Sequence, residues 1–163
     1  MEKETINIRS DSKDWRGAIL SNLAHTPFEV GGYAFLSVES ALQGIKFFDR
    51  KKREEIFCLD GLSALREGRK ITNAIKDPNE TYVYWDGKRI IYNSIEHRLL
   101  IAMFIGEKIR QNKKVQEALL ATSGTFIYHD VGHESPNTSL PEKFYVEILL
   151  SQRKLLKRLN SIK

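Results

Sequence analysis

Apolar residues recur along the chain with two different spacings, and these separate the expected strands from the expected helices. Alternation at every second position is typical of a strand, whereas recurrence every three or four positions is typical of a helix. Residues 5–8 alternate, which predicts a short strand or extended arm. Helices are expected over 38–48, 50–56, 62–69, 95–111, 113–121 and 142–160.

Two segments have the pattern of β-hairpins. In 27–35 the turn is expected at Gly31-Gly32, and in 81–92 it is expected around Asp86-Gly87. Glycine pairs and Asp-Gly adopt the positive φ angles of tight hairpin turns at little cost. A further short strand is expected at 126–128.

Because helices dominate and the β elements are small, we predict an α+β fold, mostly helical with small β-hairpins. No fixed-period repeat and no low-complexity linker divides the sequence. The prediction is therefore a single domain over 1–163.

Helix ends have local signals of their own. Ser37 is a favourable N-cap, and Ser40 stands where a capping box needs Glu or Gln, so no capping box is expected. Gly68 is expected to end the helix over 62–69 as a C-cap. The side chains expected to point inward from the last helix are Phe144, Ile148, Leu155 and Leu159.

Composition points to an intracellular protein. Cys58 is the single cysteine, so an internal disulfide is excluded and a reducing, cytoplasmic setting is expected. The longest apolar run, Leu99–Ile105, is too short to span a bilayer, and the charged residues 1–4 predict no signal peptide. We expect no membrane partner.

The chain has 26 Lys and Arg against 21 Asp and Glu, a net charge of +5. Much of the excess lies in 153–163, where no acidic residue occurs. Such an end fits a nucleic-acid or nucleotide partner, and it equally fits a solvated helix end whose cations suit the helix dipole. Both interpretations stay open.

Standard catalytic and metal motifs are absent from the sequence. Glu96 and His97 have one half of a metal-binding pattern, but no second histidine follows four residues on. We interpret them as an exposed helical pair. Neither a metal nor a cofactor is expected.

The most informative segment is 20–47. Its Ser-Asn and Pro-Phe pairs, glycine turn, Ser37, Glu39 and final Gln-x-x-Lys-Phe resemble the signature of the NADAR/YbiA-like family. The matching positions are Ser21, Asn22, Pro27, Phe28, Gly32, Phe35, Ser37, Glu39, Gln43, Lys46 and Phe47. Three later segments are also similar to that family, namely 52–56, 65–69 and 108–122.

The resemblance implies an N-glycosidase, acting on an ADP-ribosylated base or on a nucleotide-like intermediate of riboflavin metabolism. Breaking a glycosidic C–N bond builds positive charge on the ribose, and a carboxylate at Glu39 suits that charge or activates water. Asn22 and Gln43 suit ribose hydroxyls or base edges, and Lys46 and Arg69 suit a phosphate. Without the resemblance, Glu39 reads as an acid favoured by a helix N-terminus. Tyr33 is a candidate for stacking on a base.

Several positions depart from the family pattern. Ser40 replaces the histidine that follows the glutamate, and Asn93 stands where many members have tryptophan. The loop 129–136 replaces a tryptophan-containing loop, so Asp130 or Glu134 is left to supply its carboxylate. We count Asp130 as a second catalytic candidate, and Asn93, His129 and Glu134 as substrate-binding candidates.

Loss of tryptophans weakens base stacking, which is worth ~1–3 kcal/mol per base. The alternative function is therefore a non-catalytic module that binds ADP-ribose or nucleic acid. The expected partner is a nucleotide-like small molecule or an ADP-ribosylated nucleic acid. The long loop 130–141 is either a functional lid or a surface connection made rigid by its prolines.

Overall fold

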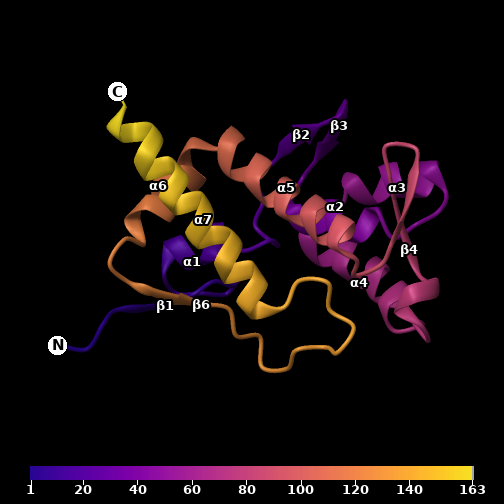
Figure 1. The fold of residues 1–163 in the computed structure, drawn as a ribbon, viewed down its shortest axis with the longest axis horizontal. Helices are drawn as coiled ribbons and strands as arrows, with labels where there is room; N and C mark the ends of the chain where they lie inside the picture. The colour runs from indigo at the N-terminus through magenta and orange to yellow at the C-terminus, as the bar shows by residue number, and fades with distance from the viewer. Residues whose placement is uncertain (163) are drawn as a thin grey trace.

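A computed structural model of the protein describes residues 1–162 (Figure 1). Its elements follow the predicted order, except that Trp15–Leu20, expected to be irregular, forms a helix, and a 3-10 turn was not predicted. The α+β class, mostly helical, is confirmed. The helices are α1 (Trp15–Leu20), α2 (Val38–Gly44), α3 (Arg50–Phe57), α4 (Gly61–Thr72), α5 (Ile95–Gln111), α6 (Lys113–Ala121) and α7 (Glu142–Ser161), with a 3-10 turn at Pro78–Glu80. Within residues 1–162 no helix is both long and apolar enough to cross a membrane.

The strands form small two-stranded sheets. Both predicted hairpins are confirmed: β2 (Phe28–Val30) pairs with β3 (Tyr33–Phe35), and β4 (Tyr82–Trp85) pairs with β5 (Lys88–Ile91). Asp86 and Gly87 turn with φ angles of 50° and 70°, as the Asp-Gly signal predicts. The expected arm at the N-terminus, β1 (Thr5–Asn7), pairs in parallel with β6 (Phe126–Tyr128), so two segments far apart in the sequence lie side by side.

The start of α2 differs from the expectation at Ser40. Ser37 Oγ accepts from the Ser40 N–H at 3.0 Å, and Ser40 Oγ accepts from the Ser37 N–H at 3.1 Å. A capping box is therefore present, and the prediction that it is absent was wrong. Both serines are buried. The short Ser40 hydroxyl reaches the Ser37 N–H, so it replaces the longer Glu or Gln side chain of the usual capping box.

Gly68 also differs from the expectation. It lies inside α4, which continues to Thr72, and is not a C-cap. A Cβ at this position would lie 1.6 Å from Gln43 Oε1, so the absence of a side chain allows α4 to pack closely on α2. Gly68 is therefore needed for the packing of two helices and not for the end of its own helix.

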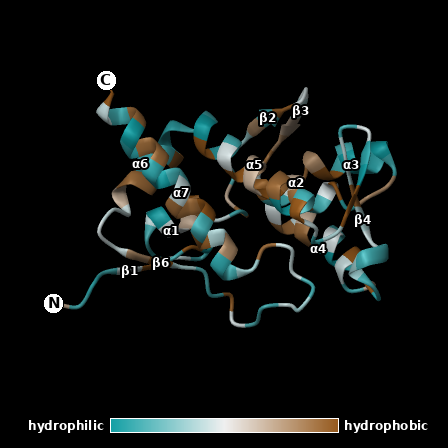
Figure 2. Ribbon diagram, in the orientation of Figure 1, coloured by the Kyte–Doolittle hydropathy of each residue, from teal (hydrophilic) through white to brown (hydrophobic). Residues whose placement is uncertain are grey.

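The core lies around α5, which crosses the middle of the molecule (Figures 1 and 2). Its residues Ile101, Phe104 and Ile105 are at most 1% exposed. Phe104 belongs to a cluster of aromatic rings that packs α3 and the two hairpins against α5. The cluster comprises Phe28, Tyr33, Phe35, Phe57, Trp85 and Phe104.

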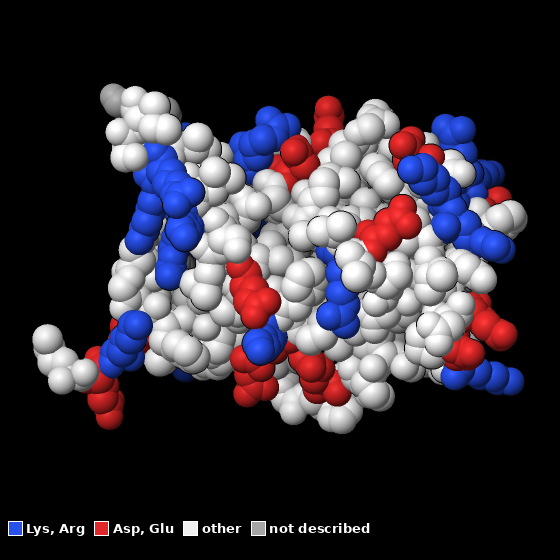
Figure 3. Space-filling model, viewed as in Figure 1, with Lys and Arg blue, Asp and Glu red and all other residues white. Residues whose placement is uncertain are grey.

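The last helix buries a different face from the one expected. Ile148 is buried and Phe144 packs partly against the core, as predicted, but Leu155 and Leu159 are 48% and 50% exposed. The C-terminal half of α7 extends past the body (Figure 1), so no neighbouring element covers those leucines. Exposed Lys and Arg side chains line this half (Figure 3).

Candidate functional site

Glu39 lies in the first turn of α2. The turn of chain that contains Asn22 holds the backbone of Glu39 in place. Its backbone N–H donates to the Asn22 carbonyl at 2.9 Å. Its carboxylate accepts a hydrogen bond of 2.5 Å from Gln43 Nε2, one helical turn later. Burial raises the pKa of Glu39, although the Gln43 hydrogen bond lowers it. A carboxyl group whose pKa is raised by its surroundings is a candidate for proton transfer.

Three of the predicted site residues, from separate segments, act on the charge of this carboxylate. The charges of Lys46, Arg69 and His129 each lower the Glu39 pKa, against the larger effect of burial. Lys46 is 8% exposed, and burial lowers its pKa to about 8. Arg69 is exposed on α4, and His129, which follows β6, is fixed by a 2.5 Å hydrogen bond from Nδ1 to the Ile8 carbonyl. The fold therefore places α2, α4 and the end of β6 around one carboxylate.

Two amide oxygens near Glu39 have no partner. Asn22 Oδ1 and Gln43 Oε1 are buried and accept no hydrogen bond within residues 1–162. Leaving a buried acceptor unsatisfied costs ~1–3 kcal/mol. Such atoms in a native fold call for a water or a ligand that donates hydrogen bonds.

The turn that carries Asn22 is fixed by residues that the sequence reasoning did not assign to the site. Lys108, 1% exposed on α5, donates to the carbonyls of Ile19 at 2.9 Å and Ser21 at 2.7 Å. Tyr145 of α7 donates to the Leu20 carbonyl between them. The one sequence feature that points to Lys108 is that it begins the family-like segment 108–122. No sequence feature points to Tyr145, because its position depends on how α7 packs.

A second polar cluster adjoins Lys46. The interpretation of His97 as exposed was wrong, because it is 1% exposed and its Nδ1 accepts from the Asn93 N–H at 2.9 Å. Burial, together with the charges of Lys46 and Arg98, lowers the His97 pKa to about 4. Lys46 Nζ donates to Thr72 Oγ1 at 2.7 Å. Helical periodicity alone does not predict that His97 is buried, since tertiary packing decides which face of α5 is covered.

The long loop is attached to this cluster at two points. The Tyr92 hydroxyl donates to the Asn137 carbonyl at 2.5 Å, and Asn93 Nδ2 donates to the Thr138 carbonyl at 3.3 Å. Asn93 has a φ of 63°, a conformation that asparagine tolerates better than most residues. The Asn93 side chain therefore holds the loop, where a tryptophan would present a stacking surface.

The remaining candidates have partners elsewhere. Asp130 is exposed and its Oδ1 accepts from the Gly132 N–H at 2.8 Å. Glu134 Oε2 accepts from the Glu142 N–H at 2.8 Å, which supplies α7 with a cap that Pro141 lacks. Tyr33 packs in the aromatic cluster, 5.8 Å from Phe57 between ring centroids. A role for these three in a reaction stays a prediction.

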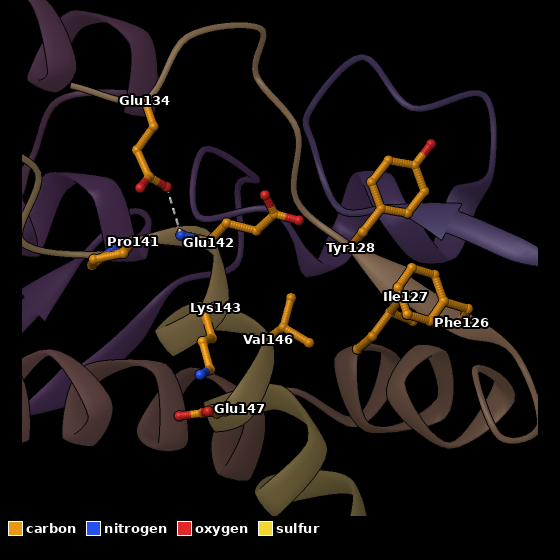
Figure 4. A pocket seen from close by; sticks show the side chains of 9 residues that line it. All are labelled: Phe126, Ile127, Tyr128, Glu134, Pro141, Glu142, Lys143, Val146 and Glu147. Atoms are coloured by element: carbon orange, nitrogen blue, oxygen red, sulfur yellow. Dashed lines mark hydrogen bonds between the residues drawn. The ribbon is translucent and has the colours of Figure 1, made fainter. Parts of the chain in front are cut away.

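A surface hollow of about 530 Å³ lies between β6 and α7 (Figure 4). Its wall includes Glu134 and Glu142, joined by the hydrogen bond drawn in the figure. Glu39 and the residues around it are not part of that lining. The hollow and the Glu39 site are therefore separate features.

Comparisons with known proteins agree with this architecture. The model of the family described as bacteriophage protein GP30.3 matches residues 14–154. A protein of enterobacteria phage T4, described as an uncharacterized 17.1 kDa protein in the Gp30-rIII intergenic region, is 30% identical over 146 residues, covering 88% of this chain and 93% of the relative. The NMR structure of the E. coli protein YbiA is similar with a TM-score of 0.65 and 23% identity, over 98% of this chain and 89% of YbiA.

The chain therefore belongs to the bacteriophage protein GP30.3 family, a NADAR-type family. Its fold is YbiA-like. The resemblance drawn from residues 20–47 is confirmed at this level.

Proposed function

We propose that the protein is an N-glycosidase that hydrolyses the bond between a ribose and a base in a nucleotide-like substrate. The observation that carries the proposal is the partly buried Glu39 carboxyl, which is hydrogen-bonded to Gln43, acted on by the charges of Lys46 and Arg69, and close in the fold to two unpaired amide oxygens. An ADP-ribosylated base and a riboflavin-pathway nucleotide both have the chemistry that this arrangement suits.

The arrangement has two chemically different halves. One half consists of hydrogen-bond acceptors, namely Asn22 Oδ1, Gln43 Oε1 and the Glu39 carboxylate. Acceptors of this kind suit the hydroxyl groups of a ribose, which donate hydrogen bonds. Lys46 and Arg69 supply positive charge and suit a phosphate. A ribose that carries both free hydroxyls and a phosphate matches both halves.

The reaction follows from this pose. As the C–N bond breaks, its electron pair passes to the base nitrogen and positive charge develops at the anomeric carbon, where the Glu39 carboxylate stabilises it. Water adds its oxygen to that carbon, and the proton it releases ends on the leaving base. The raised pKa of Glu39 makes it the stronger base for taking that proton from water and passing it to the leaving base.

A second candidate is a module that binds ADP-ribose or a nucleic-acid end without cleaving it. It is favoured by Asn93, whose side chain is bonded to the loop at Thr138 instead of offering an aromatic surface to a base. In that case the acceptor and cationic halves bind the ligand, and Glu39 contributes to recognition alone.

A substrate panel decides between the two. Wild-type protein, Glu39→Gln and the exposed control Glu117→Gln are incubated with ADP-ribosylated guanine nucleic acid and riboflavin-pathway nucleotides, and released base is measured by chromatography. We expect turnover in the wild type and the control, and a loss of about 10²–10³-fold in Glu39→Gln. Full activity of Glu39→Gln removes Glu39 from the mechanism. Tight ADP-ribose binding without any turnover favours the binding module.

A further inference from the structure

The C-terminal half of α7, residues 153–162, extends past the body of the protein and forms an amphipathic projecting end. Its apolar side chains are spaced four and three positions apart, which places them on one face of the helix. They are Leu155, Leu159 and Ile162, with exposed fractions of 48%, 50% and 81%. The exposed cations beside them are Lys154, Lys157 and Arg158. The family model matches only as far as residue 154, so the family pattern does not account for most of this end.

The side chains of the projecting end suit a protein surface better than a nucleic acid. Lysine and arginine suit phosphates, but leucine and isoleucine have no planar ring on which a base can stack. An apolar face beside cations matches an apolar surface that has carboxylates at its edge, because both the apolar areas and the charges are then complementary.

The chain itself has a surface of that kind, the hollow of about 530 Å³ between β6 and α7 (Figure 4). Phe126 on its wall is 56% exposed, and its ring is stacked on that of Tyr128 at 6.3 Å between centroids. Val146 adds a further apolar side chain. The charged residues of the lining are three acids and one base, namely Glu134, Glu142, Glu147 and Lys143. The hollow therefore combines exposed apolar area with an excess of negative charge.

The hollow and the projecting end lie on different halves of one continuous helix, Glu142–Ser161. At 1.5 Å per residue, Val146 and Leu159 are about 20 Å apart along the helix axis. A straight helix cannot turn back on itself, so a chain cannot fill its own hollow with its own projecting end. The complementary surface is reached by another copy of the chain.

We propose that the protein self-associates, with the projecting end of one copy docked in the hollow of a second copy. The apolar faces meet, and the cations of the projecting end face the carboxylates of the hollow. Because the two surfaces differ, the contact is head-to-tail and can continue beyond a pair. Glu39 and the residues around it take no part, so the inference is independent of the proposed function. A contact of this limited size is weak, with an expected dissociation constant on the order of 10–100 µM.

Sedimentation equilibrium from low micromolar to near-millimolar concentration measures the association. We expect the average mass of the wild type to rise with concentration, and to rise less in high salt, which screens the charges. Leu159→Ser in the projecting end and Glu147→Lys at the hollow are both at exposed positions, and each is expected to raise the dissociation constant at least about tenfold. The matched controls are Leu62→Ser on α4 and Lys114→Glu on α6, both also exposed, and they are expected to leave the association unchanged.

A charge exchange tests whether these two surfaces meet each other. Lys157→Glu and Glu147→Lys are each expected to weaken self-association when studied alone. In an equimolar mixture the acidic projecting end of the first variant faces the more basic hollow of the second, so association is expected to return. The double variant with both changes in one chain is expected to self-associate as well.

Three outcomes overturn the proposal. The first is a wild type that stays monomeric throughout the concentration range. The second is an association that Leu159→Ser does not weaken, or that the mixture of charge variants does not restore. The third is a monomer that binds a fluorescent single-stranded oligonucleotide and loses that binding in Lys157→Glu, which would assign the projecting end to nucleic acid.

Discussion

Gln43 donates a hydrogen bond to the Glu39 carboxylate across one turn of α2, at 2.5 Å. The other end of the same amide, Oε1, faces Gly68 on α4. The contact between Gln43 and Glu39 thus depends on a third position that has no side chain. The candidate catalytic carboxyl is oriented by the packing of two helices as well as by its own helix.

Gly68→Ala is expected to destabilise the protein. Alanine normally gains ~1 kcal/mol over glycine inside a helix, but its Cβ would lie 1.6 Å from Gln43 Oε1. Overpacking of this kind costs ~1–3 kcal/mol, so we expect a net loss in the free energy of unfolding, measured with urea. Gly106→Ala on α5 is the control, because there the new Cβ meets only the end of the Gln152 side chain, at 3.2 Å. Equal stability of Gly68→Ala and the wild type contradicts the packing argument.

Tyr145→Phe is expected to loosen the turn that carries Asn22. The change leaves the Leu20 carbonyl without its donor in a buried setting, at a cost of ~1–3 kcal/mol. Thermal unfolding measures the loss, and amide hydrogen exchange at residues 19–22 locates it. Tyr128→Phe, at a half-buried tyrosine of β6, serves as the control. Unchanged exchange at 19–22 would show that the hydroxyl does not anchor the turn.

The lowered pKa of Lys108 predicts that the free energy of unfolding increases with pH. Burial lowers its pKa to about 7 in the folded protein, against 10.5 when it is exposed. Between these values the unfolded chain binds the proton and the folded protein does not, so the free energy of unfolding increases as the pH rises from 7 towards 10.

Lys108→Met removes this titration, so its free energy of unfolding is expected to rise less over the same range. Urea unfolding at pH 7, 8, 9 and 10 compares it with the wild type and with Lys114→Met, an exposed position on α6. Lys46, with a folded pKa of about 8, contributes in the same direction in all three proteins and cancels in the comparison. Parallel curves for the wild type and Lys108→Met would contradict a depressed pKa at Lys108.

Two leucines of α7 are expected to respond differently to truncation. Leu149 is 1% exposed, and Leu149→Ala is expected to cost ~2–5 kcal/mol. Leu155 is 48% exposed, and Leu155→Ala is expected to change stability by no more than ~0.5 kcal/mol. Urea unfolding of both variants tests which face of the helix is covered. A large loss for Leu155→Ala would mean that the projecting half of α7 is packed against something in solution.

The local features of the fold were predictable because short-range signals control them. Asp86-Gly87 adopts positive φ angles wherever it turns a hairpin, so 81–92 folded as expected. The helix at 95–111 was predicted with its observed bounds because its periodic run and the following Asn112 lie within one stretch of sequence. Half of the candidate site was predictable for the same reason. Glu39, Gln43 and Lys46 are spaced by about one helical turn within a single segment around α2.

The sequence by itself determined the family, both hairpins, every helix except the one at Trp15–Leu20, and the chemical types grouped on residues 22–46. Only the tertiary structure decided what those groups face. It placed Gly68 inside a helix where Gln43 packs against it, and it buried His97. It also brought Lys108 and Tyr145 onto the turn before α2. It also left Leu155 and Leu159 exposed. Hydrogen bonds and burial between residues far apart in the chain depend on where whole helices pack, and the spacing of residues within one segment does not contain that information.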